Sequence, residues 1–150
     1  MTRTGLSFSY ETYIRATPDR VWQAFTDGDL TAQYFFGARV QSGWRPGNHI
    51  VYIGPDGTTP MAEGTIAEAD PGRRLVYRAR LLHDPEVAQD APIRLTWQIT
   101  PLGEVCKLVL THDEFAGETA TYRAVTSGVP AILAGIKTLL ETGEPLTIPE

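Results

Sequence analysis

The stretch Val129–Gly143, VPAILAGIKTLLETG, decides the fold of this chain. Its apolar residues recur at the three-and-four spacing that places them on one face of an α-helix; they are Val129, Ile132, Leu133, Ile136, Leu139 and Leu140. Pro130 suits the first turn of a helix, and Gly143 suits the left-handed residue that commonly ends one. We therefore predict a helix from Pro130 to Thr142 whose apolar stripe packs on another layer. A short helical lead-in over Glu118–Thr126, with a bend at Gly128, is expected before it.

The sequence before this helix is typical of an antiparallel sheet. Phe8–Ala16 has the period of a half-buried strand, with Phe8, Tyr10 and Ile14 on the buried side. Turn sequences rich in glycine, proline and aspartate separate six further strands; these are Ala38–Gln41, Asn48–Ile53, Met61–Ala69, Arg74–Leu82, Ile93–Thr100 and Val105–Phe115. Because short turns join antiparallel neighbours, we predict one antiparallel sheet of about seven strands.

Two short helices are expected between the first and second strands. Thr17-Pro18-Asp19 supplies a helix cap, a proline for the first turn and an acidic residue at the positive end of the helix dipole. That helix should end by Asp27, and a second should follow over Leu30–Phe35. The order predicts an α+β helix-grip fold, in which a curved antiparallel sheet wraps around the long C-terminal helix.

Composition limits the classes of protein. A length of 150 residues suits one core, so residues 1–150 are expected to form a single domain. The formal net charge of −5, without a basic cluster, disfavours nucleic acid as a partner. No apolar run approaches the roughly 18 residues of a membrane span, and the first residues lack the apolar core of a signal peptide. We expect a cytoplasmic protein without a membrane span.

Candidate chemical groups are few. His49, His83 and His112 do not share the spacing of a metal site, and no nucleotide-binding loop occurs, so neither metal nor cofactor is predicted. The single Cys106 is expected to be buried and unreactive. His112 lies two residues beyond Leu110 on the buried face of its strand. A neutral imidazole there either is satisfied within the core or exchanges hydrogen bonds with a ligand.

Aromatic residues allow two interpretations, a filled core or the wall of a pocket. We leave Tyr34, Tyr77 and Trp97 open, since a buried ring can still offer its polar atom to a ligand. If a pocket exists, we predict that nine residues bind its ligand and that none is catalytic; the nine are Tyr34, Tyr77, Trp97, Leu110, His112, Val129, Ile132, Leu133 and Ile136.

Four stretches resemble a known family: ATPDRVWQAFTD (Ala16–Asp27), the G-x-I-x-E-x-D-P-x-R-x-L-V-Y run (Gly64–Tyr77), LVLTHDEF (Leu108–Phe115) and SGVPAILAGIKTLLETG (Ser127–Gly143). The chain resembles the START-like (SRPBCC) superfamily, the birch-pollen-allergen and polyketide-cyclase group. Within it, the chain is similar to the family of the C-terminal domain of the activator of the heat-shock protein 90 ATPase. It departs in one place: members commonly have a tryptophan where Val129 stands.

The resemblance implies a cavity between sheet and helix, which the superfamily uses for lipids, sterols, polyketides or aromatic compounds. Our leading hypothesis is a protein that binds an apolar or aromatic small molecule, lipid-like or polyketide-like, without chemistry of its own. The alternative is a protein-interaction module with a partner such as a chaperone, which predicts a filled core and an exposed patch. A third hypothesis is a cyclase-type or hydrolase-type enzyme that uses His112.

Overall fold

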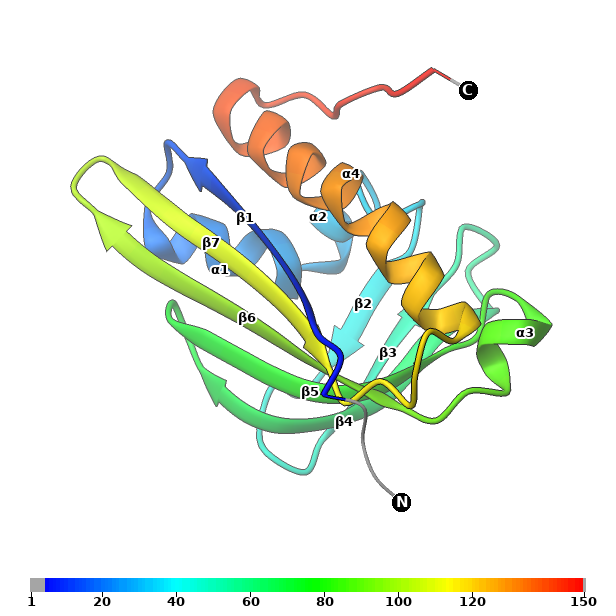
Figure 1. Ribbon diagram of the computed structural model, residues 1–150. Helices are drawn as coiled ribbons and strands as arrows, with labels where there is room; N and C mark the ends of the chain where they lie inside the picture. The colour runs from blue at the N-terminus through cyan, green and yellow to red at the C-terminus, as the bar shows by residue number, and fades with distance from the viewer. Residues whose placement is uncertain (1–4, 150) are drawn as a thin grey trace.

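Seven strands form one antiparallel sheet in the order β1-β7-β6-β5-β4-β3-β2, and the last helix, α4, lies across it (Figure 1). The computed structural model describes residues 5–149. The strands are β1 (Phe8–Ile14), β2 (Arg39–Ser42), β3 (His49–Ile53), β4 (Pro60–Asp70), β5 (Arg74–Leu81), β6 (Ile93–Leu102) and β7 (Val105–Asp113). The helices are α1 (Pro18–Thr26), α2 (Gly28–Thr31), α3 (Pro85–Ala88) and α4 (Ala120–Thr142). The predicted α+β helix-grip fold is confirmed.

Helix α4 is longer than the sequence pattern indicated. Its N-cap is Thr119, whose side chain accepts a hydrogen bond from the amide of Tyr122, so Pro130 lies inside the helix and the predicted start is wrong. A proline costs a helix one internal hydrogen bond, but apolar residues on both sides of it, such as Val125 before it and Leu133 after it, are buried by keeping the helix continuous. The predicted end is confirmed, because Gly143 has a φ of 81°.

The short helices agree in part with the prediction. Helix α1 begins as expected, with Thr17 as its cap and Pro18 in its first turn. Helix α2 ends at Thr31 rather than Phe35, because the buried Thr31 hydroxyl donates to the carbonyl of Ala38 and accepts from the amide of Val40. These bonds turn the chain into β2. The connection between β5 and β6 contains the one-turn helix α3.

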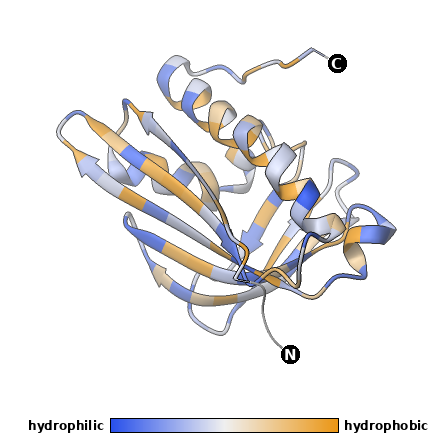
Figure 2. Cartoon of the chain, viewed as in Figure 1, coloured by the Kyte–Doolittle hydropathy of each residue, from blue (hydrophilic) through white to orange (hydrophobic). Residues whose placement is uncertain are grey.

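The face of the sheet toward α4 is apolar, as the bands of hydrophobic residues along its strands show (Figure 2). The residues of β6 and β7 that alternate on this face are all buried; they are Ile93, Leu95, Trp97, Ile99, Cys106, Leu108, Leu110 and His112. Tyr10 is the exception on β1, with 41% of its surface exposed. It lies opposite Leu110 on the edge strand, where no further strand covers its outer side.

Hydrogen bonds fasten the C-terminal half of α4 to this edge strand. Lys137 Nζ donates to the carbonyl of Tyr13 over 2.6 Å, and the amide of Arg15 donates to Glu141 Oε2 over 2.8 Å. The same carboxylate pairs with Lys137, and these hydrogen bonds, that from Lys137 most of all, lower the pKa of Glu141. Backbone groups that an edge strand leaves unpaired are therefore satisfied by the helix.

By length and composition alone, α4 is apolar enough to cross a membrane. A helix at the centre of a protein core meets the same criteria. Here 44% of the most apolar 18-residue window is buried within the fold, and Leu133 and Ile136 have no exposed surface. We therefore assign α4 to the core.

Gly64 marks the closest approach of two strands. It lies opposite Ala79, and a Cβ at this position would come within 1.8 Å of the Arg78 carbonyl oxygen, a backbone atom that cannot turn away. We predict that Gly64→Ala lowers the free energy of unfolding by about 3 kcal/mol, measured by chemical denaturation. Gly117→Ala is the control, because nothing lies within 4 Å of its Cβ position. Equal midpoints for the two variants would contradict this account.

Candidate functional site

A pocket of about 430 Å³ lies between the N-terminal half of α4 and the sheet. Its walls come from the loop after α2, from strands β4 to β7 and from α4. The lining residues are Phe35, Phe36, Ala38, Met61, Ala62, Leu81, His83, Leu95, Trp97, Leu110, His112, Ala124, Val125, Ser127, Gly128, Val129 and Ile132. None of them is an acid, a lysine or an arginine, so the wall carries no formal charge unless a histidine is protonated.

The pocket exists because the two halves of α4 meet the rest of the fold differently. In the C-terminal half, a Cβ at Gly135 would lie 2.8 Å from Tyr34 Cβ, so the helix packs there with no space to spare. In the N-terminal half, the lining residues Ala124, Ser127 and Gly128 have small side chains that leave space unfilled. Small residues occur in both halves of α4, but Tyr34 fills the space next to Gly135, so room is left in the N-terminal half.

Five of the nine residues predicted to bind a ligand line this pocket: Trp97, Leu110, His112, Val129 and Ile132. Four do not: Tyr34, Tyr77, Leu133 and Ile136. Leu133 and Ile136 lie farther along α4, in the half that packs closely, and are completely buried. The structure thus brings the predicted residues of β6 and β7 together with Val129 and Ile132 of α4.

The two tyrosines lie outside the pocket because the core itself satisfies their hydroxyl groups. Tyr34 donates to the carbonyl of Ala24 over 2.7 Å. The Tyr77 hydroxyl bonds the hydroxyl of Tyr52 over 2.7 Å and accepts from Trp97 Nε1 over 3.2 Å. Burial raises the pKa of Tyr34, Tyr52 and Tyr77, so all three hydroxyls stay protonated near neutral pH. They are structural hydrogen-bonding groups.

His112 is the buried polar residue of the pocket wall, with 4% of its surface exposed. Its Nδ1 has no hydrogen-bond partner among the described residues. Burial lowers the pKa of the ring to about 4, against a smaller opposing effect of Asp113, so the imidazole is neutral near pH 7. A neutral imidazole can donate one hydrogen bond and accept one. His112 can therefore bind a polar ligand atom, and no described acid, base or nucleophile is hydrogen-bonded to its side chain.

Charged residues next to His112 are paired outside the pocket. Arg94 Nε donates to Asp113 over 2.9 Å, and Arg78 makes two hydrogen bonds of 2.8 Å to the carboxylate of Glu114. Such two-point pairs fix the geometry of both partners. They hold the end of β7, and therefore the backbone of His112, in place.

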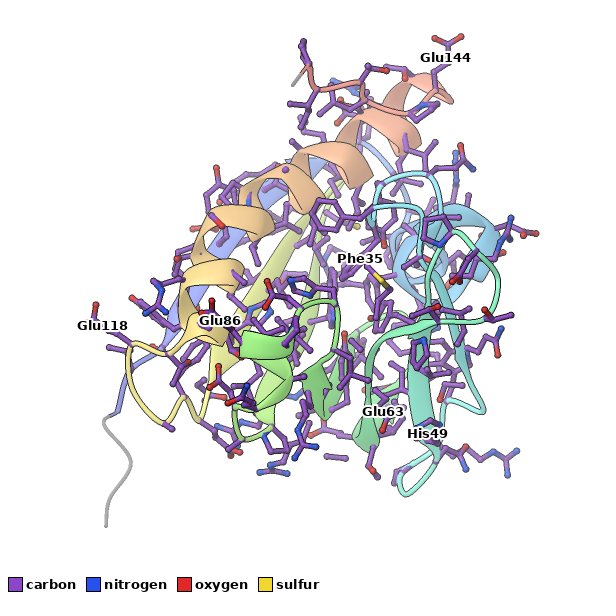
Figure 3. The ribbon with its side chains drawn as sticks, turned by 90° about the vertical axis from the view of Figure 1, so that its right-hand side faces the viewer. Phe35, His49, Glu63, Glu86, Glu118 and Glu144 are labelled. Carbon is purple, nitrogen blue, oxygen red and sulfur yellow. The ribbon has the colours of Figure 1, made fainter. Side chains whose placement is uncertain are left out.

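Sequence reasoning missed several residues of the wall. Phe35 lies in the interior below α4, where its ring stacks on Tyr52 with centroids 4.8 Å apart (Figure 3). Phe36 has a φ of 54° and is 61% exposed, at the rim. Ala124 and Val125 lie before Pro130, where the predicted helix had not yet begun. Extending the apolar stripe of α4 backwards past the proline would have found them.

In residues 5–149, nothing supports metal binding or a reactive thiol. Within this part of the chain, no group of three or more histidine, cysteine, aspartate or glutamate side chains could hold a metal ion. Cys106 is buried, its Sγ lies 3.3 Å from the Ala16 carbonyl oxygen, and burial raises the pKa of its thiol. A protonated, enclosed thiol is a poor nucleophile.

Comparison with known proteins decides the family. The family model described as activator of Hsp90 ATPase homolog 1-like protein matches residues 15–141. The chain belongs to this family. No curated protein sequence matches the chain.

Solved structures of this family's fold resemble the chain closely in shape and weakly in sequence. Protein MLL2253 from Mesorhizobium loti has a TM-score of 0.76 at 20% identity, over 91% of this chain and 97% of that one. An Hsp90 activator from Plasmodium falciparum has a TM-score of 0.73 at 17% identity, over 91% and 97%. CalU16 from Micromonospora echinospora has a TM-score of 0.70 at 21% identity, over 93% and 76%. At these identities the likeness extends to the fold alone.

The buried neutral state of His112 predicts an acid-sensitive fold. Because the folded pKa, about 4, lies below the ordinary value of 6.5, the unfolded chain binds the proton first. Stability should fall as the pH drops from about 6.5 to about 4, by about 3 kcal/mol from this residue. Denaturation at successive pH values should show a smaller loss in His112→Leu than in the wild type. His49→Gln, at an exposed position, should follow the wild type; identical profiles for all three would contradict the assignment.

Proposed function

We propose that this protein binds a small apolar or aromatic molecule, lipid-like or polyketide-like, in the pocket between α4 and the sheet. The observation that carries the proposal is an uncharged, largely apolar space of about 430 Å³ with one buried polar residue, His112. Ligand pockets commonly measure about 300–1,000 Å³ and combine apolar walls with a few polar groups. Protein cores otherwise contain few voids larger than a water molecule.

Burial would supply most of the binding energy. Each 100 Å² of apolar surface that leaves water contributes about 2.5 kcal/mol before the costs of association. Phe35 and Phe36 are the partly exposed aromatic residues of the wall, and their rings suit a planar ligand. The polar residue then sets the orientation of the ligand more than its affinity.

The family supports a second candidate, interaction with a chaperone. The matching family model bears the name of a heat-shock protein 90 ATPase activator, and a similar solved structure is described as such an activator. The pocket argues against chaperone interaction as the sole function, because a domain that only binds a partner protein is expected to have a filled core. We expect this protein to leave the ATPase rate of heat-shock protein 90 unchanged in a coupled assay. A concentration-dependent rise of twofold or more would favour the chaperone candidate.

Filling the pocket tests the leading proposal. In a thermal-shift screen of fatty alcohols, sterols, flavonoids and other aromatic compounds, we expect the wild type to show saturable increases in Tm, of several degrees when the ligand is at about 100 times its Kd. Ala124→Phe, which places a ring in the pocket, should lose these increases. Ala134→Phe is the matched control, since Ala134 is a half-buried residue of the same helix outside the pocket wall. A silent screen with wild type, or equal shifts in all three proteins, would refute the proposal.

A further inference from the structure

We propose that the pocket selects neutral hydroxylated aromatic compounds, holds their hydroxyl group by a hydrogen bond to His112, and rejects carboxylates of the same shape. This selectivity rests on the binding function proposed above and names the chemical class of its ligand. Three features of the wall support it: the absence of charge, the unpaired ring nitrogen and the position of the solvent-exposed residues.

The absence of charge excludes an ionised ligand group. No lysine or arginine lines the pocket. On β5 and β6, Arg78 and Arg94 are paired with Glu114 and Asp113, and Arg80 donates to the Asp90 carbonyl. A carboxylate that entered the pocket would lose its hydration without gaining a cation, which is costly. An ammonium group would meet the same difficulty, because no acid lines the wall either. The structure therefore favours an uncharged ligand.

A hydroxyl group is a suitable partner for the unpaired ring nitrogen of His112. A buried polar atom without a partner destabilises the fold, and Nδ1 of His112 is such an atom among the described residues. In a neutral imidazole, Nδ1 either lacks a hydrogen or carries one, depending on the tautomer. The nitrogen without a hydrogen needs a hydrogen-bond donor, and the N–H needs an acceptor. A hydroxyl can donate to the first and accept from the second. A hydroxyl group therefore satisfies His112 in both states with one atom.

The exposed and buried residues of the pocket wall indicate how a ligand would be oriented. The exposed residues of the wall are Phe36, His83 and Ser127, so the pocket opens to solvent on their side. Trp97 and His112 belong to the buried part of the wall. The hydroxyl would thus lie at the inner end, with the aromatic body between Trp97 and the phenylalanine at the rim.

Three probes of one shape test the selectivity: 2-naphthol, 2-methylnaphthalene and 2-naphthoate, titrated calorimetrically at pH 7.5. With the wild type we expect 2-naphthol to have a Kd roughly tenfold below that of the methyl analogue, and 2-naphthoate to be the weakest of the three. In His112→Leu, 2-naphthol should fall to the affinity of the methyl analogue, whose own Kd should change little. His112→Gln, which keeps a hydrogen-bonding group, should recover part of the preference.

Thr126→Ala is the matched control, because Thr126 is a half-buried residue of the same helix outside the pocket wall, and its hydroxyl donates to the Arg123 carbonyl. It should retain the wild-type preference. Equal affinity of the three probes for the wild type, or a preference that persists in His112→Leu, would overturn the selectivity and leave the binding function standing. Binding of none of the probes, together with a silent screen, would overturn both. If His112→Leu does not fold, the test rests on the ratios of the three Kd values for the wild type and on the His112→Gln variant.

Discussion

The contact between α4 and the structure beneath it is uneven, and the candidate site depends on that unevenness. Gly135 lets the C-terminal half of the helix approach Tyr34 so closely that no side chain fits between them. Two to three turns earlier, the helix has small residues such as Gly128 and Ala124, and the Phe36 ring comes no closer than 3.9 Å to the Cβ position of Gly128. The same small side chains thus produce close packing at one end of α4 and an open pocket at the other.

Polar interactions around the periphery keep this arrangement rigid while leaving the pocket uncharged. Lys137 and Glu141 fasten one half of α4 to the edge strand. Arg78 and Arg94 fasten the end of β7 through paired carboxylates. These ion pairs are partly exposed and contribute modestly to stability. They pair Asp113 and Glu114, the two charged residues that follow His112, with arginines outside the pocket wall.

Family membership and local chemistry give different kinds of information here. The family match and the similar solved structures establish the fold, and one of those structures is described as an activator of heat-shock protein 90. A shared fold does not transfer an activity, since function depends on particular side chains at a site. Our proposal that the pocket binds a small neutral molecule therefore rests on the residues of its wall and not on the family name.

The sequence by itself determined the order of the elements, the buried face of each central strand and the end of α4 at Gly143, because these follow from local periodicity and backbone preference. It also identified Trp97, Leu110 and His112 as inward-facing residues. Only the tertiary structure decided that α4 continues through Pro130, since burial along the whole stripe outweighs one lost hydrogen bond. It likewise decided that Tyr77 bonds Tyr52 and Trp97 rather than a ligand, because those partners lie 25 and 20 residues away along the chain. The volume of the pocket depends on the sum of such distant contacts, which no local pattern records.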